Sequence, residues 1–411
     1  MGISPIKCPV QILVALATLF PAVLCMSFAS AQENDEHPGK ASLPGFIEVG
    51  GVADFILSRN RFSDGESSTS TSVKQLEVGV GIEPHAWIGS EFGWIREHEE
   101  GHGKEEDGRN LGFITGSIVV GPPDGGWWLK GGVQFLPFTL FETAGFQAVH
   151  DAGIGPLETG AIVDPLSYEF GSKREKSLLL GVSLGEFQGS VYGYQGDDAR
   201  SDEPRSGIGA VVGYRKHVDA EDEIAFNLSY IDDLGTLAGF QEEVFGHDEE
   251  AHGAHHNAHH GADHGAHHGA DHEGPPTGSD VRMPGWAAAT AIHYSGVSIT
   301  AEYMISQDRY APGVLAFDGR GARPAAWSLE VGYGFELTGR GGALALGYQG
   351  TSEAAGLGIP SIRYLSVVSV DIWKDTLSGT LEWLHDREYG TARGGSGENT
   401  NKYTLQLGVA F

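Results

Sequence analysis

The chain has 411 residues and a formal net charge of −29 at pH 7. Two or three soluble domains fit this length, and one large barrel fits it equally well. The acidic balance excludes nucleic acid as a partner, because two polyanions repel each other. Both cysteines, Cys8 and Cys25, lie within the first 31 residues.

Residues 1–31 have the pattern of a secretory signal peptide. An apolar run at residues 10–20 is followed by Ala29-Ser30-Ala31, which predicts a cut before Gln32. A membrane anchor is the alternative, but the apolar run is too short to span a bilayer. A lipoprotein cut at Cys25 is disfavoured because the large side chain of Leu24 precedes it. The mature chain then has no cysteine, so we expect neither a disulfide nor thiol chemistry.

After the signal, apolar and polar residues alternate with a period of two, as in strands that have two different faces. Sixteen such segments begin near residues 46, 73, 86, 109, 127, 174, 187, 206, 223, 285, 297, 324, 342, 361, 376 and 401, and short and long connections alternate between them. The sequence therefore predicts an all-β fold: a transmembrane antiparallel β-barrel of about 16 strands over residues 46–411. Its short turns are predicted to be periplasmic and its long loops extracellular. Residues 32–45 are predicted to form a short periplasmic segment.

A soluble β-sandwich or propeller would show the same alternation, because it also buries one face of each strand. The barrel is favoured by the export signal, by the aromatic Phe411 in the last strand and by tryptophans near strand ends. These form two predicted girdles, with Trp87, Trp127, Trp128 and Trp373 at short turns and Trp286 and Trp327 at long loops. We therefore expect a location in the outer membrane of a Gram-negative bacterium, in contact with outer-membrane lipid.

A barrel of this size has a lumen too wide for side chains to fill, so an aqueous channel is expected. The third long loop, residues 137–172, either folds into the lumen and sets its width or lies on the surface. Only residues 32–45 separate the predicted signal from the first strand, which is too few for the plug domain of an active receptor. Passage is therefore predicted to be passive.

Charged residues alternate onto the predicted inward face. The acidic ones are Glu48, Asp54, Glu77, Glu91, Glu302, Glu330 and Glu382, and the basic ones are Lys130, Arg215 and Arg363. Acidic side chains in a confined pore attract cations, but inward charges also simply keep a lumen wet, and both interpretations stay open. His293 and Ser298 lie close together without any triad motif, so no enzymatic activity is expected.

Histidines are concentrated in the fifth long loop, residues 232–284. Ten of the chain's 18 histidines lie between His247 and His272. The unit HHGADHGA begins at His259 and restarts at His267, where its first six residues recur. The candidate ligands for Zn²⁺, Ni²⁺ or Cu²⁺ are His247, His252, His255, His256, His259, His260, Asp263, His264, His267, His268, Asp271 and His272. Mobile Gly and Ala between them predict loose binding that weakens in acid. The alternative is a hydrophilic repeat with no role; no cofactor is required for the barrel itself.

Several segments carry a family resemblance. Residues Leu136, Pro137 and Phe138 are followed by Asp164, Pro165, Leu166, Glu169, Gly171, Arg174 and Glu175, and the pattern continues through PAAWSLEVGY, YQGTSEA and Pro360 with Arg363. In these segments the chain resembles the LbtU-type siderophore porin family. The resemblance implies an outer-membrane porin that admits iron–siderophore complexes without an energised plug. The His-rich insertion lies outside this pattern, and the acidic lumen suits a cationic solute better than an anionic siderophore.

The sequence thus predicts a porin for passive uptake of siderophore-bound iron or related metal species. One alternative is a cation-preferring porin whose His-rich loop gathers free metal ions. Another is a surface binding or adhesion barrel with a blocked lumen. Sixteen-stranded porins commonly form trimers, so a homotrimer is expected by analogy alone.

Overall fold

The structure, a computed structural model, describes residues 41–43, 47–62, 67–97, 112–122, 125–138, 165–171, 174–198, 201–218, 222–237, 282–373 and 376–410. The predicted signal peptide and the whole His-rich tract lie outside these residues. Within the described part of the chain, no helix is long and apolar enough to cross a bilayer.

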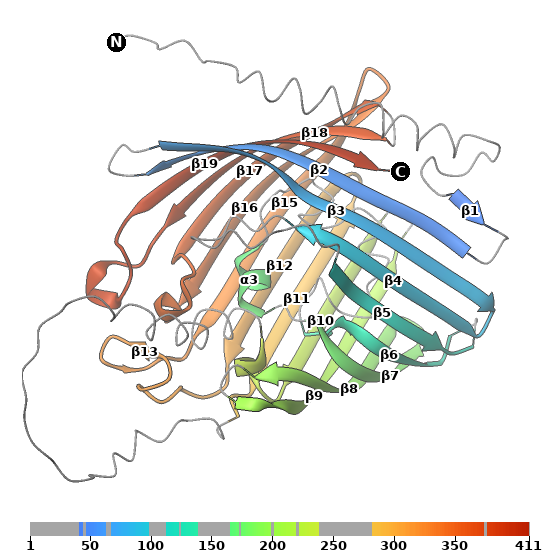
Figure 1. Ribbon diagram of the computed structural model, residues 1–411, viewed down its shortest axis with the longest axis horizontal. Helices are drawn as coiled ribbons and strands as arrows, with labels where there is room; N and C mark the ends of the chain where they lie inside the picture. The colour runs from blue at the N-terminus through green and yellow to red at the C-terminus, as the bar shows by residue number, and fades with distance from the viewer. Residues whose placement is uncertain are drawn as a thin grey trace, which may run out of the picture.

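Sixteen antiparallel strands of the described residues form one closed ring (Figure 1). They are β2 (Ile47–Phe62), β3 (Ser67–His85), β4 (Ile88–Glu97), β5 (Gly112–Val120), β6 (Trp127–Phe135), β7 (Arg174–Leu184), β8 (Phe187–Asp198), β9 (Ser201–His217), β10 (Glu223–Ile231), β11 (Gly285–Tyr294), β12 (Val297–Ser306), β15 (Ala325–Leu337), β16 (Arg340–Ser352), β17 (Ile362–Trp373), β18 (Leu377–Arg387) and β19 (Asn399–Ala410). Neighbouring strands in the chain pair with each other, and β19 pairs with β2 to close the ring. The predicted all-β barrel is confirmed.

A short additional strand, β1 (Ala41–Leu43), lies in the segment predicted to be periplasmic. It pairs with β2 between Ile47 and Val49. The last residue of β2 that β19 reaches on this side is Val52, opposite Ala410. β3 already pairs along the other edge of β2, so β1 covers the part of the β2 edge that β19 leaves open. Three residues are too few for an alternating pattern to show, which is why this strand was not predicted.

Some strands extend beyond the predicted limits. β3 starts at Ser67 instead of near residue 73, and β9 starts at Ser201 instead of near residue 206. The added parts are polar on both faces, as in the run SSTSTS that opens β3. Alternation of apolar and polar residues indicates a strand only where one face is apolar. A strand end that is polar on both faces shows no alternation and therefore is not predicted. The sixth long loop also contains a small hairpin, β13 (Ala316–Phe317) with β14 (Arg320–Gly321).

Aromatic side chains form a band at each rim of the apolar outer face. At the short-turn rim, the ring centroids of Trp87 and Trp127 lie 6.4 Å apart. At the long-loop rim, Trp327 lies 4.6 Å from Tyr348, and Tyr348 lies 5.3 Å from Tyr364. These bands have the positions of the two interfacial girdles of an outer-membrane barrel.

One predicted girdle residue points the other way. Trp127 and Trp128 are consecutive in β6, so their side chains point to opposite faces of the sheet. Trp127 is exposed on the outer face, whereas the Trp128 ring packs inside the barrel, directly over the Cα of Gly181. Trp128 therefore belongs to the interior and not to the girdle.

The apolar core lies inside the barrel, at the end that carries the long loops. Wall residues such as Leu179, Met304 and Ala326 contribute to it from the inner face. Loop residues pack on them from the third and fifth loops, from the sixth loop between β12 and β15, and from the seventh loop between β16 and β17: Leu136, Phe138, Leu166, Phe170, Leu234, Leu237, Met283, Tyr310, Leu315, Leu357 and Ile359. We call this group the loop core. Because these side chains are buried, the described loop segments fold inward and form a packed layer in the mouth of the barrel.

Candidate functional site

The third loop ends in a short helix inside the barrel. This helix, α3 (Leu166–Gly171), lies against the inner faces of β12, β15 and β16 (Figure 1). The Leu166 backbone N–H donates to Oε1 of Gln349 at 3.0 Å, and the Ser167 and Ser328 hydroxyls lie 3.2 Å apart. The side chains of Leu166 and Phe170 are fully buried in the loop core. The described end of this loop therefore lies in the lumen.

An ion-pair triad fixes α3 to the next strand. Nη1 of Arg363 in β17 donates to Oε1 of Glu169 at 2.5 Å. The same guanidinium donates two hydrogen bonds to Asp386 of β18, from Nε to Oδ1 at 2.8 Å and from Nη2 to Oδ2 at 3.0 Å. Such two-pronged contacts between a guanidinium and a carboxylate fix direction as well as distance. We call the contacts of Leu166, Ser167 and Glu169 with the wall the α3 docking site.

The end of β16 joins this docking site to the outer loops. Gln349 holds α3, and two positions on, Oγ1 of Thr351 donates to the Pro360 carbonyl and lies 2.8 Å from the Tyr389 hydroxyl. Burial raises the pKa of Tyr389 above its usual value, so its hydroxyl keeps its proton. The segment YQGTSEA thus connects the third loop, the seventh loop and the eighth loop, which joins β18 to β19, to one strand end.

Glu353, directly beyond β16, binds the sixth loop. Its carboxylate accepts hydrogen bonds from Arg309 at 2.6 and 3.1 Å, from Arg320 at 3.2 Å and from the backbone N–H of Arg323 at 2.7 Å. The bond from Arg309 and the positive charges around it lower the pKa of Glu353 below its usual value. Glu353 also adopts a φ of 53°, a left-handed conformation that is strained for a residue with a side chain. A strained backbone with this many partners indicates a built contact between loops.

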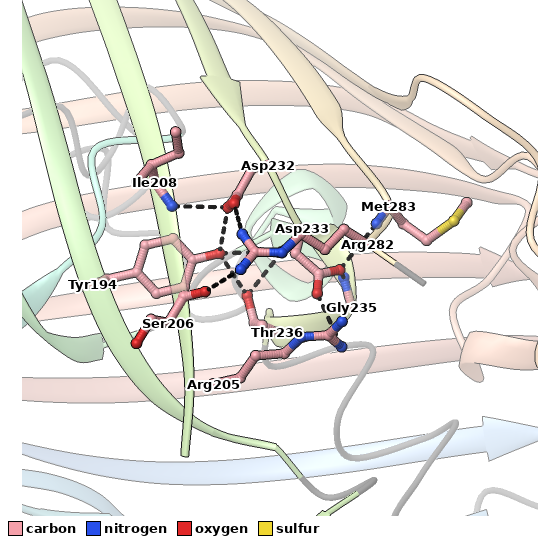
Figure 2. Close-up of polar contacts among 10 residues, drawn as sticks. All are labelled: Tyr194, Arg205, Ser206, Ile208, Asp232, Asp233, Gly235, Thr236, Arg282 and Met283. Atoms are coloured by element: carbon pink, nitrogen blue, oxygen red, sulfur yellow. Dashed lines mark hydrogen bonds and ion pairs between the residues drawn. The ribbon is translucent and has the colours of Figure 1, made fainter. Parts of the chain in front are cut away.

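A second polar cluster fixes both ends of the fifth loop (Figure 2). Oδ1 of Asp233 accepts from the N–H of Gly235 at 3.1 Å and of Met283 at 3.2 Å, so one carboxylate joins the outgoing and returning chain. Oδ2 of Asp233 lies 3.2 Å from Nη1 of Arg205 in β9. We call this group the fifth-loop base.

The neighbouring Asp232 repeats the arrangement. Its carboxylate accepts from the N–H of Ile208 at 2.8 Å, from the Tyr194 hydroxyl at 3.3 Å and from the Arg282 guanidinium. Arg282 also donates to the carbonyl of Ser206 at 2.9 Å. The residues that carry the long insertion are therefore bonded to β8 and β9 on both sides of it.

The predicted pore-lining acids of β12, β15 and β18 lie on the inner wall. Glu302, Glu330 and Glu382 are buried, and each alternates with outward side chains such as Tyr303, Leu329 and Trp383. Glu330 of β15 pairs with Thr300 of β12, which is two positions before Glu302 on the same face. Glu302 and Glu330 therefore lie diagonally across adjacent strands. Glu91 is exposed on β4. For Glu48, Asp54 and Glu77 the structure describes the positions in β2 and β3 only.

Each predicted basic residue of the lumen faces carboxylates. Nζ of Lys130 lies 4.0 Å from Glu91, and Nε of Arg215 lies 3.2 Å from Glu223. Arg363 bridges Glu169 and Asp386. Among these described wall residues, acidic side chains outnumber basic ones. Glu223 and Asp386 were absent from the predicted set, although each shares the phase of the inward residues on its own strand.

The residues of the family pattern lie in different parts of this interior. Leu136, Phe138 and Leu166 belong to the loop core. Pro137, Pro165 before α3 and Gly171 at its end are buried as well. Glu175 is buried and lies over Gly196. Arg174 is described as a strand position only, and Asp164 lies outside the described residues. The segments around Leu166 and Gln349 meet, although they are 183 positions apart.

The predicted metal ligands between His247 and His272 all lie outside the described residues. Within the part of the chain that is described, no group of three or more His, Cys, Asp or Glu side chains is arranged to hold a metal ion. His293 and Ser298 face each other across the β11–β12 turn, with no acidic side chain bonded to the histidine among the described residues.

No family model matches the chain. Over 322 residues it is 26% identical to a UPF0422 protein of Legionella pneumophila (strain Philadelphia 1), covering 74% of this chain and 53% of that protein. Over 241 residues it is 27% identical to a UPF0422 protein of Coxiella burnetii, covering 57% of this chain and 45% of that protein. The chain therefore spans about half the length of the curated relatives it matches. The likeness to the LbtU-type siderophore porin family stays a sequence-based expectation.

Two solved porin structures are similar to the whole barrel. An anion-selective porin from Comamonas acidovorans superposes with a TM-score of 0.52 at 11% identity, over 89% of this chain and 99% of the porin. Salmonella typhi OmpF, in complex with daunomycin, superposes with a TM-score of 0.53 at 10% identity, over 90% of this chain and 100% of OmpF. The chain has the porin fold. With its apolar outer face and two girdles, it lies in the outer membrane of a Gram-negative bacterium.

Proposed function

We propose that this barrel is a passive outer-membrane channel for siderophore-bound iron or related metal species, in which α3 narrows the lumen. The observation that carries the proposal is the α3 docking site. Its bonds run between the segments that resemble the siderophore porin family, from Leu166 to Gln349 and from Glu169 to Arg363. Segments of the family pattern that are far apart in the sequence thus bond to each other in the lumen. This supports the proposal that the chain has the channel architecture of that family.

The proposal includes passage without an energised plug. A solute larger than a hydrated ion then needs a constriction of fixed width, because passive selection depends on size and charge. The triad of Arg363, Glu169 and Asp386 supplies such rigidity, since it holds α3 at its acidic residue while Gln349 holds its first turn.

Uptake into liposomes tests the proposal. Purified protein would be reconstituted in vesicles without any membrane potential, and radiolabelled ferric complexes of hydroxamate, catecholate and carboxylate siderophores would be added. We expect at least one complex to equilibrate faster than a neutral oligosaccharide of equal size. Equal rates for all solutes of one size would show a general pore and would reject the siderophore assignment.

Cation preference is the second candidate, favoured by the acidic inner wall around Glu302, Glu330 and Glu382. In this version the fifth loop adds a collector for Zn²⁺, Ni²⁺ or Cu²⁺, whose ends are bonded at the mouth by Asp232 and Asp233. A preference for cations in the reversal potential, with equal uptake of all siderophore complexes, would select this function.

A surface binding barrel with a blocked lumen is the third candidate, and the packed loop core in the mouth favours it. Single-channel recording in a planar bilayer separates it from both channels. A blocked barrel passes no steady current, whereas either channel gives discrete conductance steps.

A further inference from the structure

Three arginines lie together on the lipid-facing side of the barrel. Arg59 and Arg61 belong to β2 and Arg387 belongs to β18, and β19 runs between these strands. In the register, Arg59 pairs with Tyr403, which pairs with Trp383; residues paired in this way share one face of the sheet. Tyr403 and Trp383 are exposed on the outer face, so the arginines point outward as well.

The next row of this sector is polar. Arg61 pairs with Asn401, which pairs with His385, and Nδ1 of His385 lies 3.1 Å from Oδ1 of Asn401. The rings of Trp383 and His385 stack with centroids 6.2 Å apart. The sector therefore has aromatic rings and Arg59 in its lower row, toward the membrane, and Arg61 and Arg387 above them, toward the long loops. We call it the arginine sector: Arg59, Arg61, Arg387, His385, Trp383 and Tyr403.

Its height on the barrel places these cations among lipid headgroups. In the register, Tyr348 and Tyr364 of the long-loop girdle pair on to His385, and His385 pairs through Asn401 to Arg61. Aromatic girdles mark the boundary between acyl chains and headgroups. Arg59 lies in the row of Trp383 and Tyr403, whereas Arg61 lies one row and Arg387 two rows further toward the long loops. The long loops of outer-membrane barrels face the cell exterior, so the adjacent leaflet is the outer one.

Charge in this sector contrasts with the rest of the molecule. The chain as a whole carries a formal charge of −29, whereas this sector is cationic. Among the described residues, no ion pair or hydrogen bond involves the guanidinium of Arg59, Arg61 or Arg387. Around β11 to β17, the same rim presents uncharged aromatic side chains, namely Trp286, Tyr303, Trp327, Tyr348 and Tyr364. Two copies of the arginine sector would repel each other, which disfavours self-association through it.

We propose that the arginine sector binds the phosphate groups of a glycolipid of the outer leaflet. Guanidinium groups form two-pronged, charge-assisted bonds with phosphate oxygens, and a sugar headgroup stacks on exposed Trp and Tyr rings. The ligand is a lipid and not free phosphate, because the acyl chains would lie along the apolar side chains below the arginines, such as Leu381 and Leu405. This proposal is independent of the solute that crosses the lumen.

Lipid retention tests the proposal. The wild-type protein and the triple variant Arg59→Gln, Arg61→Gln, Arg387→Gln would be exchanged into detergent containing bisphosphorylated lipid A and analysed by native mass spectrometry. Lys176→Gln is the matched control, because Lys176 is exposed on the outer face of β7 in another sector. We expect the triple variant to bind the lipid about a hundredfold more weakly and the control to bind it as the wild type does, since each basic residue near an anionic surface contributes several-fold.

Two further arms identify the ligand chemistry. Monophosphorylated lipid A should bind more weakly than the bisphosphate form, and millimolar inorganic phosphate should displace neither. Unchanged binding in the triple variant, or equal loss in Lys176→Gln, would overturn the proposal, and displacement by inorganic phosphate would show a free-anion site instead. Heat-dependent gel mobility and conductance of each variant show that the barrel is folded.

Discussion

Arg363 and Glu169 are 194 positions apart in the sequence, and their side chains meet at 2.5 Å in the lumen. Arg363 is also bonded to Asp386 on the adjacent strand, so one buried guanidinium holds a loop helix against the wall. The position of α3 in the lumen therefore depends on a few side-chain hydrogen bonds and ion pairs, and a single substitution can remove each of them.

Releasing α3 should widen the channel. Arg363→Gln leaves Glu169 and Asp386 without their cation, and removing one partner of a buried ion pair typically costs about 3–5 kcal/mol. We expect a larger and noisier single-channel conductance in planar bilayers. Arg340→Gln, at an exposed short turn of β16, is the control and should leave the conductance unchanged. A variant at Arg363 with wild-type conductance would mean that α3 does not limit the current.

Neutralising the wall should shift ion selectivity. Replacing Glu302, Glu330 and Glu382 with Gln removes negative charge from the inner wall, so the reversal potential in a salt gradient should move toward anions. The shift should shrink at high salt, because the Debye length falls to about 3 Å at 1 M. An unchanged reversal potential at low salt would show that these three carboxylates do not act on the permeating ions.

Deleting residues 246–274 should leave the barrel intact, because Asp232, Asp233 and Arg282 lie outside the deletion and keep the fifth-loop base. Loop closure alone changes stability by tenths of a kcal/mol to about 1 kcal/mol. Calorimetry should show Zn²⁺ or Ni²⁺ binding near neutral pH for the full chain only. Binding should also weaken below the usual histidine pKa of about 6.5. If the full chain binds no metal, the tract is a spacer.

The sixth loop should loosen in acid. Arg309 lowers the pKa of Glu353, so the folded protein holds the carboxylate form more strongly than the unfolded chain does. The resulting stabilisation is complete above the usual carboxylate pKa of 4.5 and is lost as the pH falls through the lowered value. The protection of the Arg323 amide, taken as its exchange rate relative to the intrinsic rate at the same pH, should therefore fall in acid. Glu353→Gln should keep this protection low at all pH values, whereas Glu336→Gln, at an exposed turn, should keep the wild-type profile.

A glycine beneath an inward tyrosine should not tolerate a methyl group. A Cβ at Gly209 would overlap the Tyr192 ring, whereas a Cβ at Gly189 would only touch the Val211 carbonyl at 3.6 Å. Overpacking of this kind typically costs about 1–3 kcal/mol. Gly209→Ala should therefore lower the unfolding temperature of the folded band on gels, and Gly189→Ala should change it less. Equal effects of both substitutions would contradict the packing described here.

The wall of the barrel could be predicted from the sequence, because alternation is a local signal. Successive residues of a strand point to opposite faces, which predicts Glu302 and Glu330 inward and Tyr303 and Leu329 outward. The structure has the same alternation. Glu223 and Asp386 have the inward phase of their strands as well, so alternation along β10 and β18 also predicts them to face the lumen.

The lumen could not be predicted in the same way. The bond from Leu166 to Gln349 and the three arginine donors of Glu353 join loops that are far apart in the chain. No periodic pattern encodes such contacts. The resemblance identified the segments around Leu166 and Gln349 as characteristic, but only the fold shows that they bond to each other. Trp128 shows the same limit. Alternation along β6 predicts that its ring points into the barrel, but the contact of the ring with Gly181 depends on the pairing of β6 with β7.

The seam between β2 and β19 has a consequence for the order of assembly. Every other pair of neighbours in the described ring is joined by a single connection, and most of these connections are short enough for a local hairpin. The seam must instead bring Val52 to Ala410, and such distant contacts form slowly because a long chain must first lose its freedom. Until then, both strands expose unpaired backbone groups that can join another chain. We therefore expect ring closure to be the slow step of folding, and open-edged dimers to be its main by-product.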